Sequence, residues 1–173
     1  VRQALCKLYK SDIAAANGSV ITAKAAPAPI LSHHSRHIVE FCCSDESRIS
    51  CSRNHVDDLC RTTRITERED ATTKAGIRAT VKACKSPNRT LLWASIPCTG
   101  GCAWNVHVNS KKSPELKQMH EEQIALFKKL WITFEKAAGV VSRNGGRIAI
   151  EWPKSCNYWL DENVQMLISK YGL

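Results

Sequence analysis

Hydrophobic residues along the chain fall into short continuous runs and longer stretches with helical spacing. The short runs lie at 37–43, 90–96 and 147–151, and each ends in polar or turn-forming residues. Runs of this kind are typical of buried strands in a parallel sheet. A further strand is predicted at 62–67, which is rich in β-branched residues.

Three helices are predicted between and after these strands. The first covers about 70–84, with Asp70 or Thr72 as its N-cap, and the last covers about 161–171. The clearest begins after Ser113, which is followed by a proline at the first helical position. Its apolar residues recur at nearly helical spacing: Leu116, Met119, Ile124, Phe127, Leu130, Trp131 and Phe134.

Strands that alternate with helices predict right-handed βαβ units. We therefore expect an α/β fold, a mostly parallel sheet with helices on both faces in a Rossmann-like arrangement. This domain would cover 37–173 and be truncated at its C-terminus, so the fold would be incomplete. Residues 1–36 are weakly patterned and include an Ala/Pro stretch at 25–29, which predicts a weakly ordered N-terminal arm or linker.

The least ordinary residues follow the predicted strands, at 40–44, 67–70, 97–101 and 151–153. Because the carboxyl ends of parallel strands meet at one edge of a sheet, these segments should lie together. Ligands of open α/β sheets bind beyond that edge. The sequence therefore predicts a binding site there.

The charge and composition of the chain indicate which classes of binding partner to expect. The chain has 173 residues with 25 Lys and Arg against 16 Asp and Glu, a net charge of +9. This excess favours nucleic acid as a partner, although a basic surface that is merely solvated explains it equally well. No run of about eighteen apolar residues occurs, so no membrane partner is expected. The oligomeric state is left open.

Nine cysteines are an odd number and too many for an ordinary chain of this length. Free thiols in a reducing compartment, nucleus or cytoplasm, explain them better than a secreted disulfide scaffold. Cys98, Cys102 and His107 raise the question of zinc, but no second close ligand pair accompanies them. No metal site is predicted.

Two motifs resemble those of the DNA cytosine-5 methyltransferases, a class I family that uses S-adenosylmethionine. The segment 94–98 is similar to their Pro-Cys motif, and 150–152 to the motif in which a glutamate ends the next strand. The acidic Glu40 falls where the family's cofactor loop begins. The resemblance covers roughly 37–170 and implies a methyltransferase fold, a nucleic-acid substrate and S-adenosylmethionine as cofactor. The residues expected to contact that cofactor are Glu40, Cys43, Ser44, Asp70 and Pro97.

The chain departs from the family's pattern at several points, among them a loop, the number of strands and the spacing of the two motifs. The loop 43–47 contains no glycine, whereas the family's loop is rich in it. Only one strand is predicted between the first strand and the Pro-Cys strand, where the full fold has two. The motif residues Cys98 and Glu151 are separated by 151 − 98 = 53 positions, and we assign the surplus length to an extended loop at 99–113.

The resemblance implies roles for two catalytic residues. Cys98 would be the nucleophile that adds to carbon 6 of cytosine, and Glu151 would contact the ring edge and assist protonation at nitrogen 3. The base would leave the stack to reach them. Trp104 and Trp152, close to the same edge, are candidate surfaces for stacking on it.

Two other hypotheses stay open. Ser95-Ile96-Pro97-Cys98 also resembles an altered form of the motif by which amino-group methyltransferases act on an exocyclic nitrogen, without a cysteine adduct. The chain could instead be a methyltransferase-like binding module that has lost catalysis. Whether the protein is an enzyme is therefore undecided at this stage.

Overall fold

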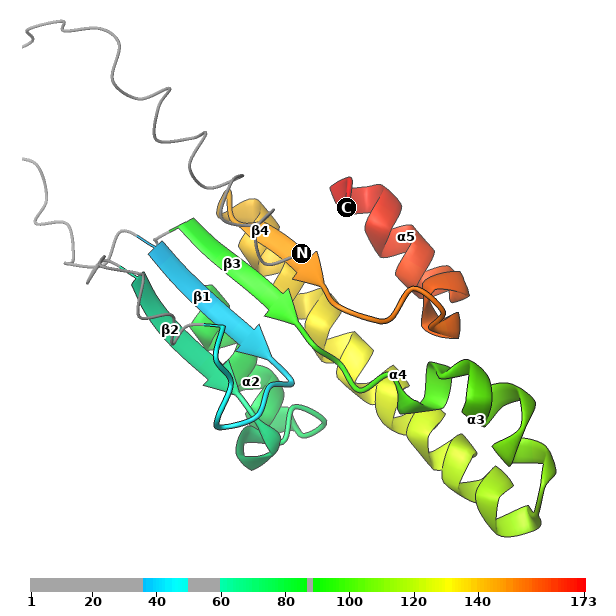
Figure 1. Cartoon of the computed structure of the whole chain (residues 1–173). Coiled ribbons are helices and arrows are strands. Elements are labelled where there is room, and N and C mark those ends of the chain that lie inside the picture. The colour runs from blue at the N-terminus through cyan, green and yellow to red at the C-terminus, as the bar shows by residue number, and fades with distance from the viewer. Residues whose placement is uncertain (1–35, 50–59, 87–88) are drawn as a thin grey trace, which may run out of the picture. The chain divides into compact units, whose positions relative to one another are not determined.

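The computed structural model describes residues 36–49, 60–86 and 89–173, which form a four-stranded, entirely parallel sheet with its helices packed around it (Figure 1). The strands are β1 (Arg36–Phe41), β2 (Cys60–Ile65), β3 (Arg89–Ala94) and β4 (Arg147–Ile150). Their order in the sheet is β2-β1-β3-β4. The predicted α/β fold with a parallel sheet is confirmed, in a small form. The predicted arm at 1–36 lies, apart from Arg36, outside the described residues.

Long helices follow β2, β3 and β4: α2 (Lys74–Cys84), α4 (Pro114–Arg143) and α5 (Glu162–Tyr171). The hydroxyl of Ser113 caps α4 by accepting from the amide of Leu116, as predicted. The predicted cap of the first helix is wrong. Thr73, whose backbone is extended, caps α2 by accepting from the amide of Gly76, because Asp70 ends a preceding 3-10 turn, η1 (Glu67–Glu69).

The segment 99–113 is mostly helical and not an extended loop, which corrects a second prediction. It contains η2 (Thr99–Gly101), α3 (Ala103–His107) and η3 (Asn109–Lys111). Both η2 and η3 pack against α4, α3 packs on these two turns, and His120 of α4 bonds the carbonyl of Gly100 through Nε2 at 2.8 Å. The added length between β3 and α4 is therefore folded onto the domain.

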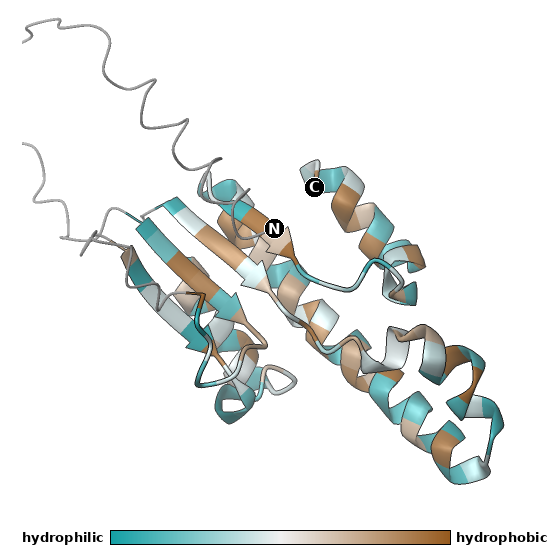
Figure 2. Ribbon diagram, viewed as in Figure 1, coloured by the Kyte–Doolittle hydropathy of each residue, from teal (hydrophilic) through white to brown (hydrophobic). Residues whose placement is uncertain are grey.

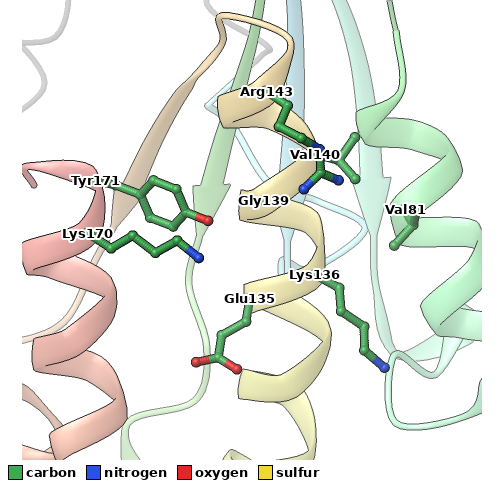
Figure 3. Close-up of a pocket in the computed structure, with 8 residues that line it drawn as sticks. All are labelled: Val81, Glu135, Lys136, Gly139, Val140, Arg143, Lys170 and Tyr171. Carbon is green, nitrogen blue, oxygen red and sulfur yellow. The ribbon is translucent and has the colours of Figure 1, made fainter.

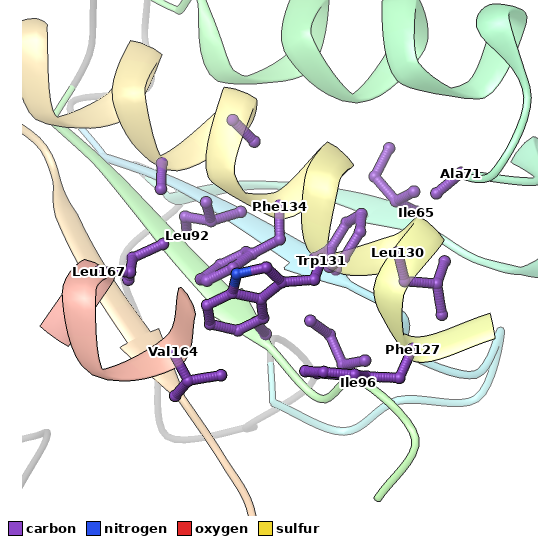
Figure 4. Packing of buried hydrophobic residues seen from close by; sticks show 14 of the residues in the cluster. Ile65, Ala71, Leu92, Ile96, Phe127, Leu130, Trp131, Phe134, Val164 and Leu167 are labelled. Atoms are coloured by element: carbon purple, nitrogen blue, oxygen red, sulfur yellow. The ribbon is translucent and has the colours of Figure 1, made fainter. Parts of the chain in front are cut away.

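One apolar core joins the sheet to its helices (Figure 4). Phe134 and Trp131 of α4 are almost fully buried, and the ring of Phe134 lies 6.0 Å from that of Phe41 in β1. Val164 and Leu167 bring α5 into the same cluster. Hydrophobic and hydrophilic residues follow one another in bands along α4 (Figure 2), as expected of a helix with one buried face.

None of the helices formed by the described residues is both long and apolar enough to cross a membrane.

Thr133 provides a test of how α4 is attached. Its buried hydroxyl donates to the carbonyl of Ala71, 62 positions earlier, at 2.7 Å. Thr133→Val keeps the shape but leaves that carbonyl without its donor, so we expect a loss of about 1–3 kcal/mol in the free energy of unfolding, measured with denaturant. Thr80→Val is the matched control, since the buried hydroxyl of Thr80 bonds only Gly76 within its own helix. Equal losses in the two variants would contradict the proposed role of Thr133.

Candidate functional site

The strand order places a topological switch point between β1 and β3. From β1 the chain moves to β2 on one side and then crosses to β3 on the other. The segments after β1 and β3 therefore separate at the carboxyl edge, where open α/β sheets bind ligands. The amide of Ser95 donates to the carbonyl of Phe41 at 3.0 Å, which keeps the two segments together just past the strands.

Glu40 is the most unusual residue at this point. It lies in β1 directly between Arg64 of β2 and Trp93 of β3, and its side chain is completely buried. Neither carboxylate oxygen accepts a hydrogen bond, and the nearest cation is the guanidinium of Arg64, with 4.0 Å from Nε to Oε2. Burial of a carboxylate with unused acceptor sites is costly. Both carboxylate oxygens of Glu40 can therefore still accept hydrogen bonds, but the surrounding packing leaves no space for a further donor.

The turn after β1 holds two cysteines beside this carboxylate. Cys42 has a φ of 59°, a left-handed conformation that costs a non-glycine residue about 1–2 kcal/mol. It bends the backbone sharply after the strand, and β1 ends two residues earlier than predicted. The Cys43 thiol donates to the carbonyl of Glu40 at 3.5 Å. Burial, followed by the charge of Glu40, raises the pKa of Cys43 to about 11, and burial raises that of Cys42 to about 12.

Glu151 belongs to a second group at the same edge. Its carboxylate accepts from the hydroxyl of Ser95 at 3.3 Å, and that hydroxyl accepts from the indole of Trp93 at 3.0 Å. Trp93 stands next to Glu40 in the sheet register. These two hydrogen bonds therefore connect the exposed Glu151 to Trp93, which lies beside the buried Glu40.

Cys98 lies in a different environment from Glu151. Its side chain is half-buried against the apolar core, and it interacts electrostatically with Cys156 and Tyr158. Burial, with smaller contributions from the neighbouring thiols, raises the pKa of both Cys156 and Tyr158. Among the contacts of the described residues, none joins Cys98 to Glu151. The two predicted catalytic residues follow adjacent strands but are not brought into contact.

Gly100 and Gly101, which follow Cys98, allow close packing against Tyr158 and Cys156. A Cβ at Gly101 would lie 2.8 Å from the sulfur of Cys156 and from the ring of Tyr158, and a Cβ at Gly100 would overlap the Tyr158 hydroxyl. The amide of Gly101 donates to the carbonyl of Cys98. Within the described ranges, no three Cys, His, Asp or Glu side chains are arranged to hold a metal ion.

The other expected cofactor contacts are not gathered around Glu40. Ser44 and Pro97 are exposed at the edge. Asp70 is exposed, has a φ of 38°, and accepts from the amide and hydroxyl of Thr72 through Oδ1. Of the five, the structure joins Glu40 and Cys43 directly.

The two candidate stacking residues differ. Trp152 is buried, and its indole donates to the carbonyl of Ile96 at 2.7 Å, so its role is packing and that prediction is wrong. Trp104 is 60% exposed. It remains a surface on which a base could stack.

Arg64 was not predicted as a site residue, and the position of Trp93 beside Glu40 was not predicted either. Arg64 lies two residues after Thr62, so both side chains lie on one face of β2. Its position opposite Glu40 depends on the register between two strands, and the sequence of β2 has no hydrophobic alternation that would specify this register.

The closeness of Glu40 to Cys43 is testable through thiol chemistry. Glu40→Gln removes a negative charge beside Cys43, so we expect the pKa of Cys43 to fall and its alkylation by iodoacetamide at pH 8 to accelerate at least threefold. Residue-resolved mass spectrometry would give the rates. Cys84, buried in α2 with a pKa raised to about 12, is the internal control and should react slowly in both proteins. Acceleration at both thiols would mean a loosened fold, and acceleration at neither would contradict the contact.

Comparisons with protein-family models, with curated proteins and with solved structures gave no match to this chain.

Proposed function

We propose that this chain is a methyltransferase-like domain that binds S-adenosylmethionine at the carboxyl edge between β1 and β3 and acts on a base of nucleic acid. The observation that carries the proposal is the buried Glu40 at the switch point, whose two carboxylate oxygens have no hydrogen-bond donor. The motif resemblance at 94–98 and 150–152 supplies the class of cofactor, and the net charge of +9 favours the class of substrate.

The described residues fit this cofactor through their charges. S-adenosylmethionine supplies a methyl group on a positively charged sulfur, and it carries hydroxyl and amino donors. Glu40 offers unused acceptors, and Arg64 beside it limits the net charge of the site. The left-handed turn at Cys42 gives the backbone after β1 the sharp bend that the family makes with glycine. A ligand would reach Glu40 only after the groups around it move, because that side chain is fully buried.

In the cytosine-5 version of the proposal, Cys98 provides the nucleophile. The thiol would lose its proton to a base or to solvent, and the thiolate would add to carbon 6 of the flipped base as the double bond between carbons 5 and 6 opens and nitrogen 3 is protonated. Once carbon 5 carries the methyl group, loss of its proton would restore the double bond and release the thiolate. Glu151 would hold the ring edge at nitrogen 3. This version requires Cys98, which packs partly buried against the apolar core, to become accessible to the base.

A second candidate is transfer to an exocyclic amino group, and the contact between Ser95 and Glu151 favours it. Both groups are polar, lie at the end of β3 and β4, and are linked at 3.3 Å. Together they could accept hydrogen bonds from an amino group and position its nitrogen. Cys98 would then be a packing residue.

Binding of the cofactor can be tested directly. Isothermal titration of the chain with S-adenosylmethionine and S-adenosylhomocysteine should give dissociation constants on the order of 10 µM, and Glu40→Gln should weaken both at least tenfold. Glu135→Gln on the helical face is the matched control and should leave both unchanged. Absence of heat at millimolar ligand, from protein with a cooperative thermal transition, would refute cofactor binding.

The role of Cys98 is a separate prediction. With oligonucleotide substrates and isotopically labelled cofactor, Cys98→Ser should abolish transfer to carbon 5, because an alcohol cannot replace the thiolate as nucleophile at neutral pH. The same substitution should leave transfer to an amino nitrogen within about threefold of wild type. Digestion of the product and chromatography of the methylated bases distinguish the two. Cofactor binding without transfer to either position would identify a binding module.

A further inference from the structure

A groove lies on the helical side of the domain, away from the carboxyl edge. It has a volume of about 430 Å³ and runs between α4 and α5, with Val81 of α2 at its border (Figure 3). The C-terminal halves of α4 and α5 form it, which places it toward the amino ends of the strands. None of the residues assigned to the cofactor or to catalysis lines it.

Gly139 forms the bare floor of the groove. A Cβ at this position would lie 3.5 Å from Nη1 of Arg143 and 3.6 Å from the hydroxyl oxygen of Tyr171. Nη1 of Arg143 and the hydroxyl oxygen of Tyr171 therefore both lie close to Gly139 and are at most about 7 Å from each other. A tetrahedral oxyanion that accepts hydrogen bonds of about 2.9 Å on both sides spans such a gap.

No packing contact requires glycine at position 139. Both distances are ordinary van der Waals contacts, so an alanine would fit without displacing a neighbour. Glycine in the interior of a helix is destabilising relative to alanine. The absent side chain leaves space for about one methyl group beneath Arg143 and Tyr171, so a ligand held by these two groups would lie directly against the backbone of α4.

The charges around this space are predominantly positive. Arg143, Lys136 and Lys170 line the groove with one carboxylate, Glu135, which accepts a hydrogen bond from the indole of Trp131. Within 36–49, 60–86 and 89–173, none of the three cations lies within 4.0 Å of a carboxylate. The ammonium of Lys170 lies 5.3 Å from the centre of the Tyr171 ring, and Figure 3 shows both side chains directed toward Gly139.

The positive charge continues along α2. That helix contains no acidic residue, and Arg78 and Lys82 on it and Lys85 directly after it are exposed. A single small anion would need only the groove, whereas a chain of phosphates would also meet these cations. The extension favours a polymer of phosphates over a small phosphorylated molecule.

We propose that the groove over Gly139 binds a backbone phosphate of nucleic acid, with Arg143, Lys170 and the Tyr171 hydroxyl as donors. Arginine matches the geometry of phosphate oxygens with paired N–H donors, and lysine adds charge. This inference deepens the proposed function by giving the substrate a second contact surface, but it requires neither S-adenosylmethionine nor methyl transfer.

Fluorescence anisotropy with labelled single-stranded and duplex oligonucleotides, in the absence of cofactor and at several salt concentrations, tests the proposal. Arg143→Gln with Lys170→Gln should weaken binding at least tenfold and lower the slope of log K against log salt by about 1–2, since each phosphate contact contributes about 0.7–0.9. Lys117→Gln is the control for the loss of a single positive charge elsewhere on α4. It removes one positive charge from α4, about 40 Å along the helix axis from Arg143, and should change affinity less than twofold.

Gly139→Ala tests whether Gly139 serves ligand binding or only the structure of α4. It should raise the melting temperature, because alanine favours the helix, and at the same time weaken oligonucleotide binding several-fold by filling the floor. Unchanged binding in this variant together with unchanged binding in the double variant would overturn the proposal. Saturation by inorganic phosphate at submillimolar concentration without oligonucleotide binding would overturn the assignment to nucleic acid. Cofactor titration of the double variant, expected to match wild type, keeps the result independent of the proposed site at Glu40.

Discussion

The buried side of α4 is the constraint on which the other parts of the domain depend. Phe134 packs on β1, Thr133 bonds the loop before α2, and Phe127 stacks on Tyr158 at 3.7 Å between ring centres. Trp131 packs on Trp152, which follows β4. One helix therefore holds the sheet, α2 and the segment after β4 in place. The carboxyl edge rests on its middle portion, and the cationic groove is formed by its last turns.

Because α4 dominates the packing, its pattern was also the most informative part of the sequence. The spacing of its apolar residues and the serine before its first turn predicted the helix and its cap, which are both observed. The strands were predicted because buried parallel strands are continuously apolar. Boundaries were less accurate. Cys42 ends β1 through a left-handed backbone that is not expected of cysteine, and Thr73 caps α2 because Asp70 is already part of another turn.

The candidate site was predictable only as a region. The clustering of polar residues after the strands identified the edge, since parallel strands end together. The pairing of Glu40 with Arg64 required the strand register, and the separation of Cys98 from Glu151 required the course of the chain beyond β3. Gly100 and Gly101 illustrate the same limit. Their spacing to Cys98 suggests a motif, but their contacts are with Tyr158 and Cys156, more than fifty positions later.

The ion pair between β1 and β2 also has a consequence for how the sheet assembles. Glu40 faces Arg64 only in the observed alignment. If β2 slipped by two residues, the same faces would still be buried, but Glu40 would meet Thr62 or Thr66 and its charge would be enclosed with no cation opposite. The penalty for such misaligned pairing is much larger than the gain from the pair itself. During folding, Glu40 would thus favour the observed alignment of β1 and β2, because it destabilises the alignments in which β2 is shifted along β1.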